Sequence, residues 1–128
     1  MKYTPENITE LNKGEVFVFG SNTMGIHGAG AAKLAMEKFD AKFGVGCGPT
    51  GRCYAIPTKD NKIQTLPITR IKEFVDSFLN YAKNKSHKTF LVTKIGCGLA
   101  GLKIANIAPM FKNKTENVIL PEEFHDYI

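Results

Sequence analysis

The chain has 128 residues, of which 43% are hydrophobic, and this is enough to bury one ordinary core without disulfides or a metal. Its apolar runs break off before the roughly 18 residues that a membrane-spanning helix needs. No basic stretch followed by an apolar stretch and a cleavage site opens the sequence. We therefore expect one domain over residues 1–128 that is cytoplasmic, is not secreted by a standard signal and has no membrane partner.

The charge of the chain favours an anionic partner. A net charge of +5 and a pI near 9.1 suit nucleic acid and also a diphosphate ligand, so the sign does not choose between them. Three cysteines, an odd count without a C-x-x-C pair, fit a reducing compartment better than a disulfide framework. The histidines and cysteines do not have metal-ligand spacing. We expect neither a metal nor a cofactor.

The first half of the chain predicts a strand, a glycine turn and a helix, followed by a second strand. The apolar run Glu15–Asn22 is typical of a buried strand, and residues 28–39 are rich in helix formers. Residues 43–51 hold four glycines and a proline, which predicts a loop. The run 52–57 predicts the second strand, ended by its proline.

The second half repeats the alternation. A helix is expected to open near Thr69, a candidate N-cap, with apolar residues at helical spacing up to position 82. A third strand over 89–95 ends in a second glycine turn, and Asn106 is expected to cap a short helix with Pro109 in its first turn. Residues 117–121 predict a last strand. Strands that alternate with helices favour an α/β fold with a mostly parallel sheet covered on both faces.

Both glycine turns follow predicted strands, where open α/β sheets place their ligands. Glycine lets the backbone approach a phosphate, and free N–H groups at a helix start favour an anion. The P-loop and dinucleotide fingerprints are absent. The turns therefore predict a phosphate site of another kind, and the alternative is that the glycines only make tight turns.

Three motifs in this order resemble macrodomains. They are residues 22–32 (NTMGIHGAGAA), 56–59 (IPTK) and 95–102 (IGCGLAGL). The resemblance is strongest to the terminal ADP-ribose glycohydrolase branch and to the antitoxin macrodomains that remove ADP-ribose from DNA. It implies a three-layer α/β/α fold that binds ADP-ribose. Over nearly its whole length the chain also resembles small phage-borne and bacterial proteins that share the phrases FGSN, HGAGAA, YAIPTKD and IGCGLAG.

The resemblance implies a role for each motif. Asn22 would contact the distal ribose, and one phosphate would be held by Gly28, Ala29, Gly30 and Ala31. The other phosphate would be wrapped by Gly96, Cys97, Gly98, Leu99, Ala100 and Gly101. Lys59 would sit near the anomeric carbon, where an amine can act as nucleophile or as acid/base.

This chain departs from the pattern at position 100. Ala100 stands where the terminal glycohydrolases carry an acidic residue that works with the lysine, although the DNA-acting antitoxins also have a small residue near there. Asp60 is a candidate to replace that acid, and its alternative reading is an ordinary turn aspartate. His27 is expected to be loop structure. Cys97, which is flanked by glycines, is expected to be a small packed residue, and its alternative is a thiol of lowered pKa.

Three functions remain open from the sequence. The first is an ADP-ribosyl glycohydrolase, a hydrolase that uses Lys59 on ADP-ribosylated DNA or protein. The second is a module that captures ADP-ribose or a related signalling nucleotide without turning it over, in conflict between phage and host. The third is a nucleic-acid-binding protein, which only the charge suggests.

Overall fold

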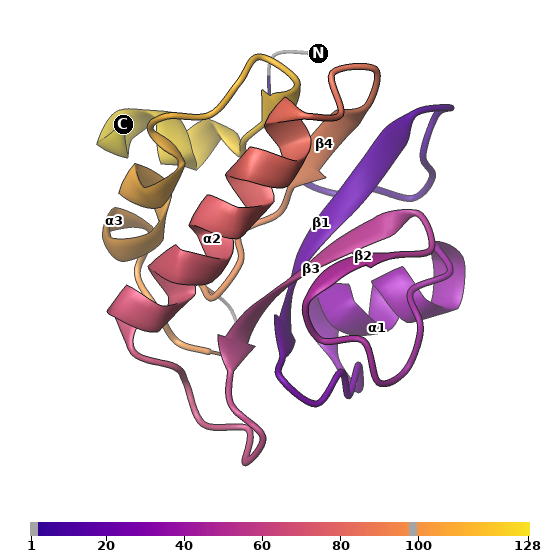
Figure 1. The fold of residues 1–128 in the computed structure, drawn as a ribbon, viewed down its shortest axis with the longest axis vertical. Helices are drawn as coiled ribbons and strands as arrows, with labels where there is room; N and C mark the ends of the chain where they lie inside the picture. Colours follow the sequence, from indigo (N-terminus) through magenta and orange to yellow (C-terminus); the bar gives the residue numbers. More distant parts are fainter. Residues whose placement is uncertain (1–2, 98–99) are drawn as a thin grey trace.

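A five-stranded mixed sheet forms the centre of the protein (Figure 1). The computed structural model describes residues 3–97 and 100–128. The strand order is β2-β3-β1-β4-β5, with β1 (Glu15–Asn22) in the middle. Four strands are parallel, and only the edge strand β2 runs antiparallel to its neighbour. The other bounds are β2 Gly48–Thr50, β3 Cys53–Lys59, β4 Thr89–Val92 and β5 Val118–Ile119.

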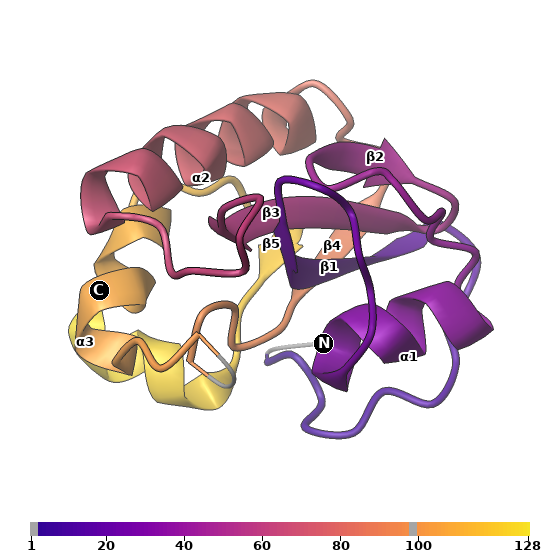
Figure 2. The ribbon, with the colours of Figure 1, turned by 90° about the horizontal axis from the view of Figure 1, so that it is seen from below.

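Helices cover both faces of this sheet (Figure 2). Helix α1 (Gly30–Lys38) packs on one face, and α2 (Ile68–Lys83) packs on the other. The face of α2 also carries α3 (Ile104–Ile107) and the 3₁₀ helices η1 (Ala108–Phe111) and η2 (Glu122–Tyr127). The α/β class and the mostly parallel sheet are therefore confirmed. Within the described parts of the chain, no helix combines the length and apolar character that crossing a bilayer would require.

Alternate side chains of β1 point to opposite faces of the sheet and belong to two separate halves of the core. Phe17 and Phe19 pack toward α1, whereas Val16 and Val18 pack toward α2. All four side chains are buried, as expected for a central strand with helices on both faces. Helix α2 buries one stripe at helical spacing, which consists of Ile71, Val75, Phe78 and Ala82.

Two strand predictions need correction. Strand β3 does not end at Pro57 but continues through it to Lys59. The edge strand β2 pairs with β3 only up to Ala55, so beyond that point the missing N–H of Pro57 costs no bond to β2. In contrast, β4 ends at Val92 and not at residue 95, because the chain then turns so that the Thr93 N–H and hydroxyl both donate to the Val18 carbonyl.

The predicted N-cap residues of two helices were wrong. Pro67, and not Thr69, is the N-cap of α2, so Thr69 lies in the first turn. Helix α3 starts at Ile104, before the predicted cap Asn106, and Pro109 is the second residue of the 3₁₀ helix η1. A proline suits either position because it has no N–H to leave unpaired at a helix start.

Candidate functional site

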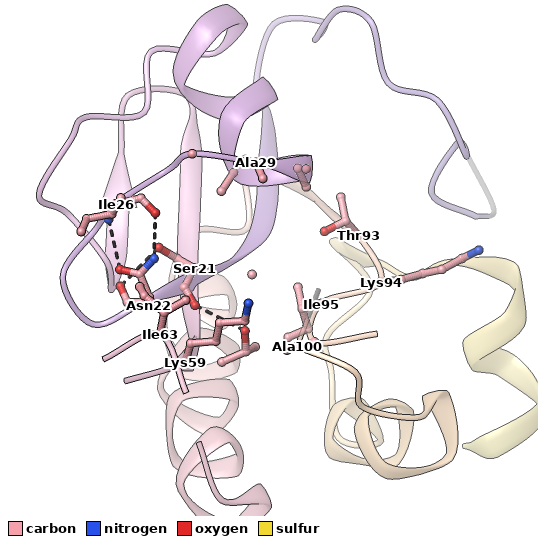
Figure 3. Close-up of a pocket in the computed structure, with 17 residues that line it drawn as sticks. Ser21, Asn22, Ile26, Ala29, Lys59, Ile63, Thr93, Lys94, Ile95 and Ala100 are labelled. Carbon is pink, nitrogen blue, oxygen red and sulfur yellow. Dashed lines mark hydrogen bonds between the residues drawn. The ribbon is translucent and has the colours of Figure 1, made fainter. Parts of the chain in front are cut away.

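A cavity of about 530 Å³ opens at the carboxyl ends of β1, β3 and β4 (Figure 3). Such sheet ends are where open α/β folds bind their ligands. Two lysines line the cavity, and none of the described lining residues is acidic. Of the predicted site, it brings together Asn22, Gly28, Ala29, Gly30, Ala31, Lys59, Gly96 and Ala100.

The start of helix α1 forms one wall of this cavity. Ala29 is the N-cap in extended conformation, and no side chain caps the first N–H groups of the nine-residue helix. Gly30 has a φ of +60°, a conformation that glycine adopts without strain. The unpaired N–H groups and the positive end of the helix dipole therefore face a cavity that has room for an anion.

Asn22 lies on the cavity wall, but its side chain also organises the loop that follows. Its Oδ1 accepts hydrogen bonds from the N–H groups of Met24 (3.2 Å) and Ile26 (3.1 Å). Its Nδ2 donates to the Ile26 carbonyl at 2.7 Å. Three of the four bonds that an amide side chain can make are thus used inside the loop, which leaves one N–H for a ligand.

The two predicted catalytic residues point in different directions. Lys59 ends β3, and Figure 3 shows its amine pointing into the cavity. Asp60 does not line the cavity. Its Oδ1 accepts hydrogen bonds from the N–H groups of Lys62 (2.8 Å) and Gln64 (3.0 Å), as the aspartate of a turn does. The structure therefore favours the turn reading of Asp60 over its proposed role as the missing acid.

Among the described residues of the second glycine turn, Gly96 and Ala100 are the two that line the cavity. Cys97 and Gly101 do not line it, and Gly98 and Leu99 lie outside the described residues. A hydrogen bond of 2.8 Å from the Leu102 N–H to the Gly96 carbonyl closes the turn. Helix α3 begins at Ile104, so the turn is followed by a helix that starts nearer to it than the predicted cap Asn106.

The Cys97 thiol is not activated as the alternative reading would require. Burial raises its pKa, and the nearby charge of Lys94 offsets only part of that effect. A thiol whose pKa is raised is mostly protonated at neutral pH and is a poor nucleophile. The packed reading of Cys97 therefore fits the structure better.

The cavity has an apolar rim that no sequence motif indicates. Ile26 and Ile63 both line it, and their side chains are 39% and 46% exposed. Ile63 also has a φ of +61°, which costs a β-branched residue about 1 kcal/mol or more. Only the run Asp60-Asn61-Lys62 indicated a turn here, and nothing in it places Ile63 over a ligand site.

Loop 22–26, which lines the cavity through Asn22 and Ile26, packs backbone against backbone on loop 43–46. A Cβ on Gly46 would lie 1.9 Å from the Asn22 carbonyl oxygen, and one on Gly25 would lie 2.3 Å from the Gly44 carbonyl carbon. The Gly44 N–H also donates to the Gly25 carbonyl at 2.9 Å. Loops 22–26 and 43–46 therefore form one unit, and only glycine fits where they touch.

A second cavity of about 920 Å³ adjoins the first. The two share Ala31, Thr93 and Lys94 as wall residues. The second cavity lies between residues 3–9, the start of α1 and the start of η2, and it is lined by the carboxylates Glu6, Glu122 and Glu123. Figure 3 shows Lys94 pointing away from the first cavity, and its ammonium pairs with Glu123.

His27 lies beneath the first glycine turn and should make stability depend on pH. Its side chain is 1% exposed, its Nε2 lies 3.2 Å from the Ser21 Oγ, and its ring packs edge-on against Phe19. Burial lowers its pKa, and the Val45 backbone partly offsets this. As pH falls below about 6.5, the unfolded chain therefore binds a proton before the native protein does, so stability falls.

This predicts a free energy of unfolding that decreases between about pH 7 and pH 5 in urea titrations. His27→Gln should flatten that decrease, whereas the same change at the exposed His87 should not. An equal decrease in the wild type and in His27→Gln would show that other groups cause it.

The comparisons with known proteins give information on the fold alone. No family model and no curated protein matches the chain. A solved structure of a protein of unknown function from Bacteroides thetaiotaomicron is similar, with a TM-score of 0.62 and 14% identity. The match covers 88% of this chain and 90% of that one. At this identity the likeness shows a shared fold alone.

Proposed function

We propose that the protein has a macrodomain-like α/β/α fold, binds ADP-ribose or a nucleotide that contains it, and removes ADP-ribose from a modified substrate with Lys59. One observation carries the proposal: the uncapped start of α1 faces a cavity that also receives the Lys59 amine and has no acidic residue in its described lining. Backbone N–H donors and a helix dipole are groups that bind a diphosphate, and the Lys59 amine is the group that would act at the distal ribose.

The adjoining cavities fit a ligand with two different ends. The first cavity supplies the N–H groups at the start of α1, which suit the diphosphate, and the amine of Lys59, which suits the distal ribose. The second supplies carboxylates, which suit the hydrogen-bond donors of an adenine amino group. Since Ala31, Thr93 and Lys94 line both, one elongated nucleotide can span them.

The chemistry that we propose centres on Lys59. Its amine enters the cavity from the end of β3. There it would either attack the anomeric carbon of the distal ribose as the bond to the modified group breaks, with water then cleaving the adduct to free ADP-ribose, or protonate the leaving group while water attacks that carbon. The macromolecule that bears the ADP-ribose would be DNA or protein. Ile63 and Ile26 at the rim offer apolar surface to the group attached to that ribose.

One observation favours a second function. Asp60 is engaged in its own turn, Ala100 has no acid group, and no described residue of the first cavity carries a carboxylate. A site without an acid partner for its lysine suits a module that captures an ADP-ribose-type signalling nucleotide without cleaving it. Such a module would act in conflict between phage and host.

Both functions require that ADP-ribose binds, and calorimetric titration tests this. We expect a Kd for ADP-ribose in the micromolar range or tighter, and binding of adenine at least about tenfold weaker, because the phosphate contacts should dominate. Adenosine provides the control for the ribose. Equal affinities for adenine and ADP-ribose would contradict a phosphate site at the start of α1.

A further inference from the structure

Three connections at the opposite edge of the sheet gather positive charge. Residues 12–15, 83–89 and 112–117 lead into β1, β4 and β5, so they lie at the amino ends of the strands, away from the cavity (Figure 1). The Thr89 N–H donates to the Gly14 carbonyl at 2.9 Å, which joins the first two connections. The Asn117 Nδ2 donates to the Lys85 carbonyl at 3.2 Å, which joins the second and third. We call this surface the basic edge.

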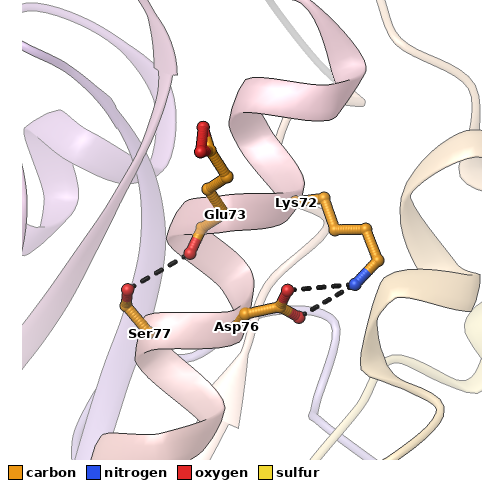
Figure 4. Close-up of polar contacts among 4 residues, drawn as sticks. All are labelled: Lys72, Glu73, Asp76 and Ser77. Carbon is orange, nitrogen blue, oxygen red and sulfur yellow. Dashed lines mark hydrogen bonds and ion pairs between the residues drawn. The ribbon is translucent and has the colours of Figure 1, made fainter.

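The basic edge holds six lysines and two glutamates, so it supplies four of the five net positive charges of the chain. None of these lysines has an ion pair among the residues that the structure describes. Figure 4 shows the contrast on α2, where Lys72 pairs with both oxygens of Asp76. The six are Lys13, Lys83, Lys85, Lys88, Lys112 and Lys114.

The chemistry of the basic edge suits phosphates and little else. None of the large exposed apolar side chains in the described chain lies in the three connections, so the surface has no apolar anchor for a membrane, and the imidazole of His87 is the one ring in these connections. Arginine is the side chain that most often contacts base edges, and both arginines of this chain already have partners within the protein. The Arg52 Nη2 donates to the carbonyls of residues 11 and 12, and Arg70 pairs with Glu73.

We propose that the basic edge binds the phosphate backbone of duplex nucleic acid without sequence preference. Unpaired lysines in adjoining connections can each neutralise a phosphate and release counterions, which gives affinity but no base readout. This inference goes beyond the proposed function and does not depend on it. Since the cavity lies at the other edge of the sheet, duplex and ADP-ribose should bind independently.

Fluorescence anisotropy with a labelled duplex of about 20 base pairs tests this at about 50 mM and 200 mM salt. The wild type should bind with micromolar affinity at the lower salt and more weakly at the higher. Lys83→Glu/Lys85→Glu/Lys88→Glu should weaken binding at least about tenfold and lower the salt slope by about three, one phosphate for each lysine. The affinity for ADP-ribose should not change.

The matched control is Lys33→Glu/Lys62→Glu/Lys103→Glu, which changes the net charge equally at exposed lysines outside the basic edge. It should weaken duplex binding less than about threefold, a modest effect of net charge alone. An equal loss in both triple variants would overturn the proposal, as would a wild type that fails to bind duplex at low salt. Tighter binding to polyglutamate than to duplex would also overturn it and would identify an acidic protein as the partner.

Discussion

Replacing Lys59 by alanine should leave ADP-ribose binding within about threefold of wild type and reduce its release from a modified substrate at least about a thousandfold. Affinity and release should respond differently because the amine would act chiefly on the transition state, whereas the backbone at the start of α1 would hold the phosphates. Calorimetry with free ADP-ribose gives the first quantity. Single-turnover release from ADP-ribosylated DNA and from ADP-ribosylated glutamate peptides gives the second.

Lys62→Ala is the matched control for that experiment, because Lys62 is an exposed lysine three residues further along the same loop and does not line the cavity. It should release ADP-ribose like the wild type. Near-normal release by Lys59→Ala would remove the lysine from the mechanism. A wild type that binds ADP-ribose but releases none from either substrate would leave the capturing module as the function.

The second large effect is expected at Gly28, where valine should raise the Kd for ADP-ribose at least about a hundredfold without unfolding the protein. No atom lies within 4 Å of a Cβ placed on Gly28, and its φ is not positive, so the backbone tolerates a side chain there. The isopropyl group would instead occupy the cavity beside the start of α1. The melting temperature should stay within about 3 °C of wild type, a shift of less than about 1 kcal/mol.

Gly28→Ala should have an intermediate effect on affinity, since its side chain fills less of the cavity. Gly30 is less suitable for this test because its φ of +60° makes any side chain strain the backbone by about 1 kcal/mol or more. If folded Gly28→Val keeps the affinity of the wild type, the first glycine turn is structural and the phosphates are bound elsewhere.

The parts of the fold that could be predicted are those with a strong local pattern. The run of apolar residues in β1 and the helical spacing of Ile71, Val75 and Phe78 identify a central strand and an amphipathic helix on their own. Strand β2 has only three residues, and pairing with β3 is what makes it a strand. Likewise, β3 can extend through Pro57 because β2 no longer pairs with it there. No sequence pattern shows where that pairing ends.

The candidate site could be predicted only where a motif coincides with a strand end. Residues 28–31 follow β1, and Lys59 ends β3. Because these two strands pair in parallel, both sets of residues lie at one cavity. The role of Asp60 depends on which N–H groups its carboxylate meets, and this could not be predicted. The second cavity joins residues 3–9 to residues 121–123, a contact between segments far apart in the chain that no local signal indicates.

The close contact between loops 22–26 and 43–46 limits how the site can change during evolution. Because Gly46 touches the Asn22 carbonyl and Gly25 touches Gly44, an insertion or a larger residue in either loop would force the other to change with it. The turn after Lys59 is held by hydrogen bonds of its own, to the Asp60 carboxylate and from the Asp60 N–H to the Gln64 carbonyl at 2.7 Å, and by one of 2.9 Å from Thr65 to the Ala100 carbonyl. Homologues that differ in substrate should therefore vary around position 63 while they keep both glycine loops at constant length.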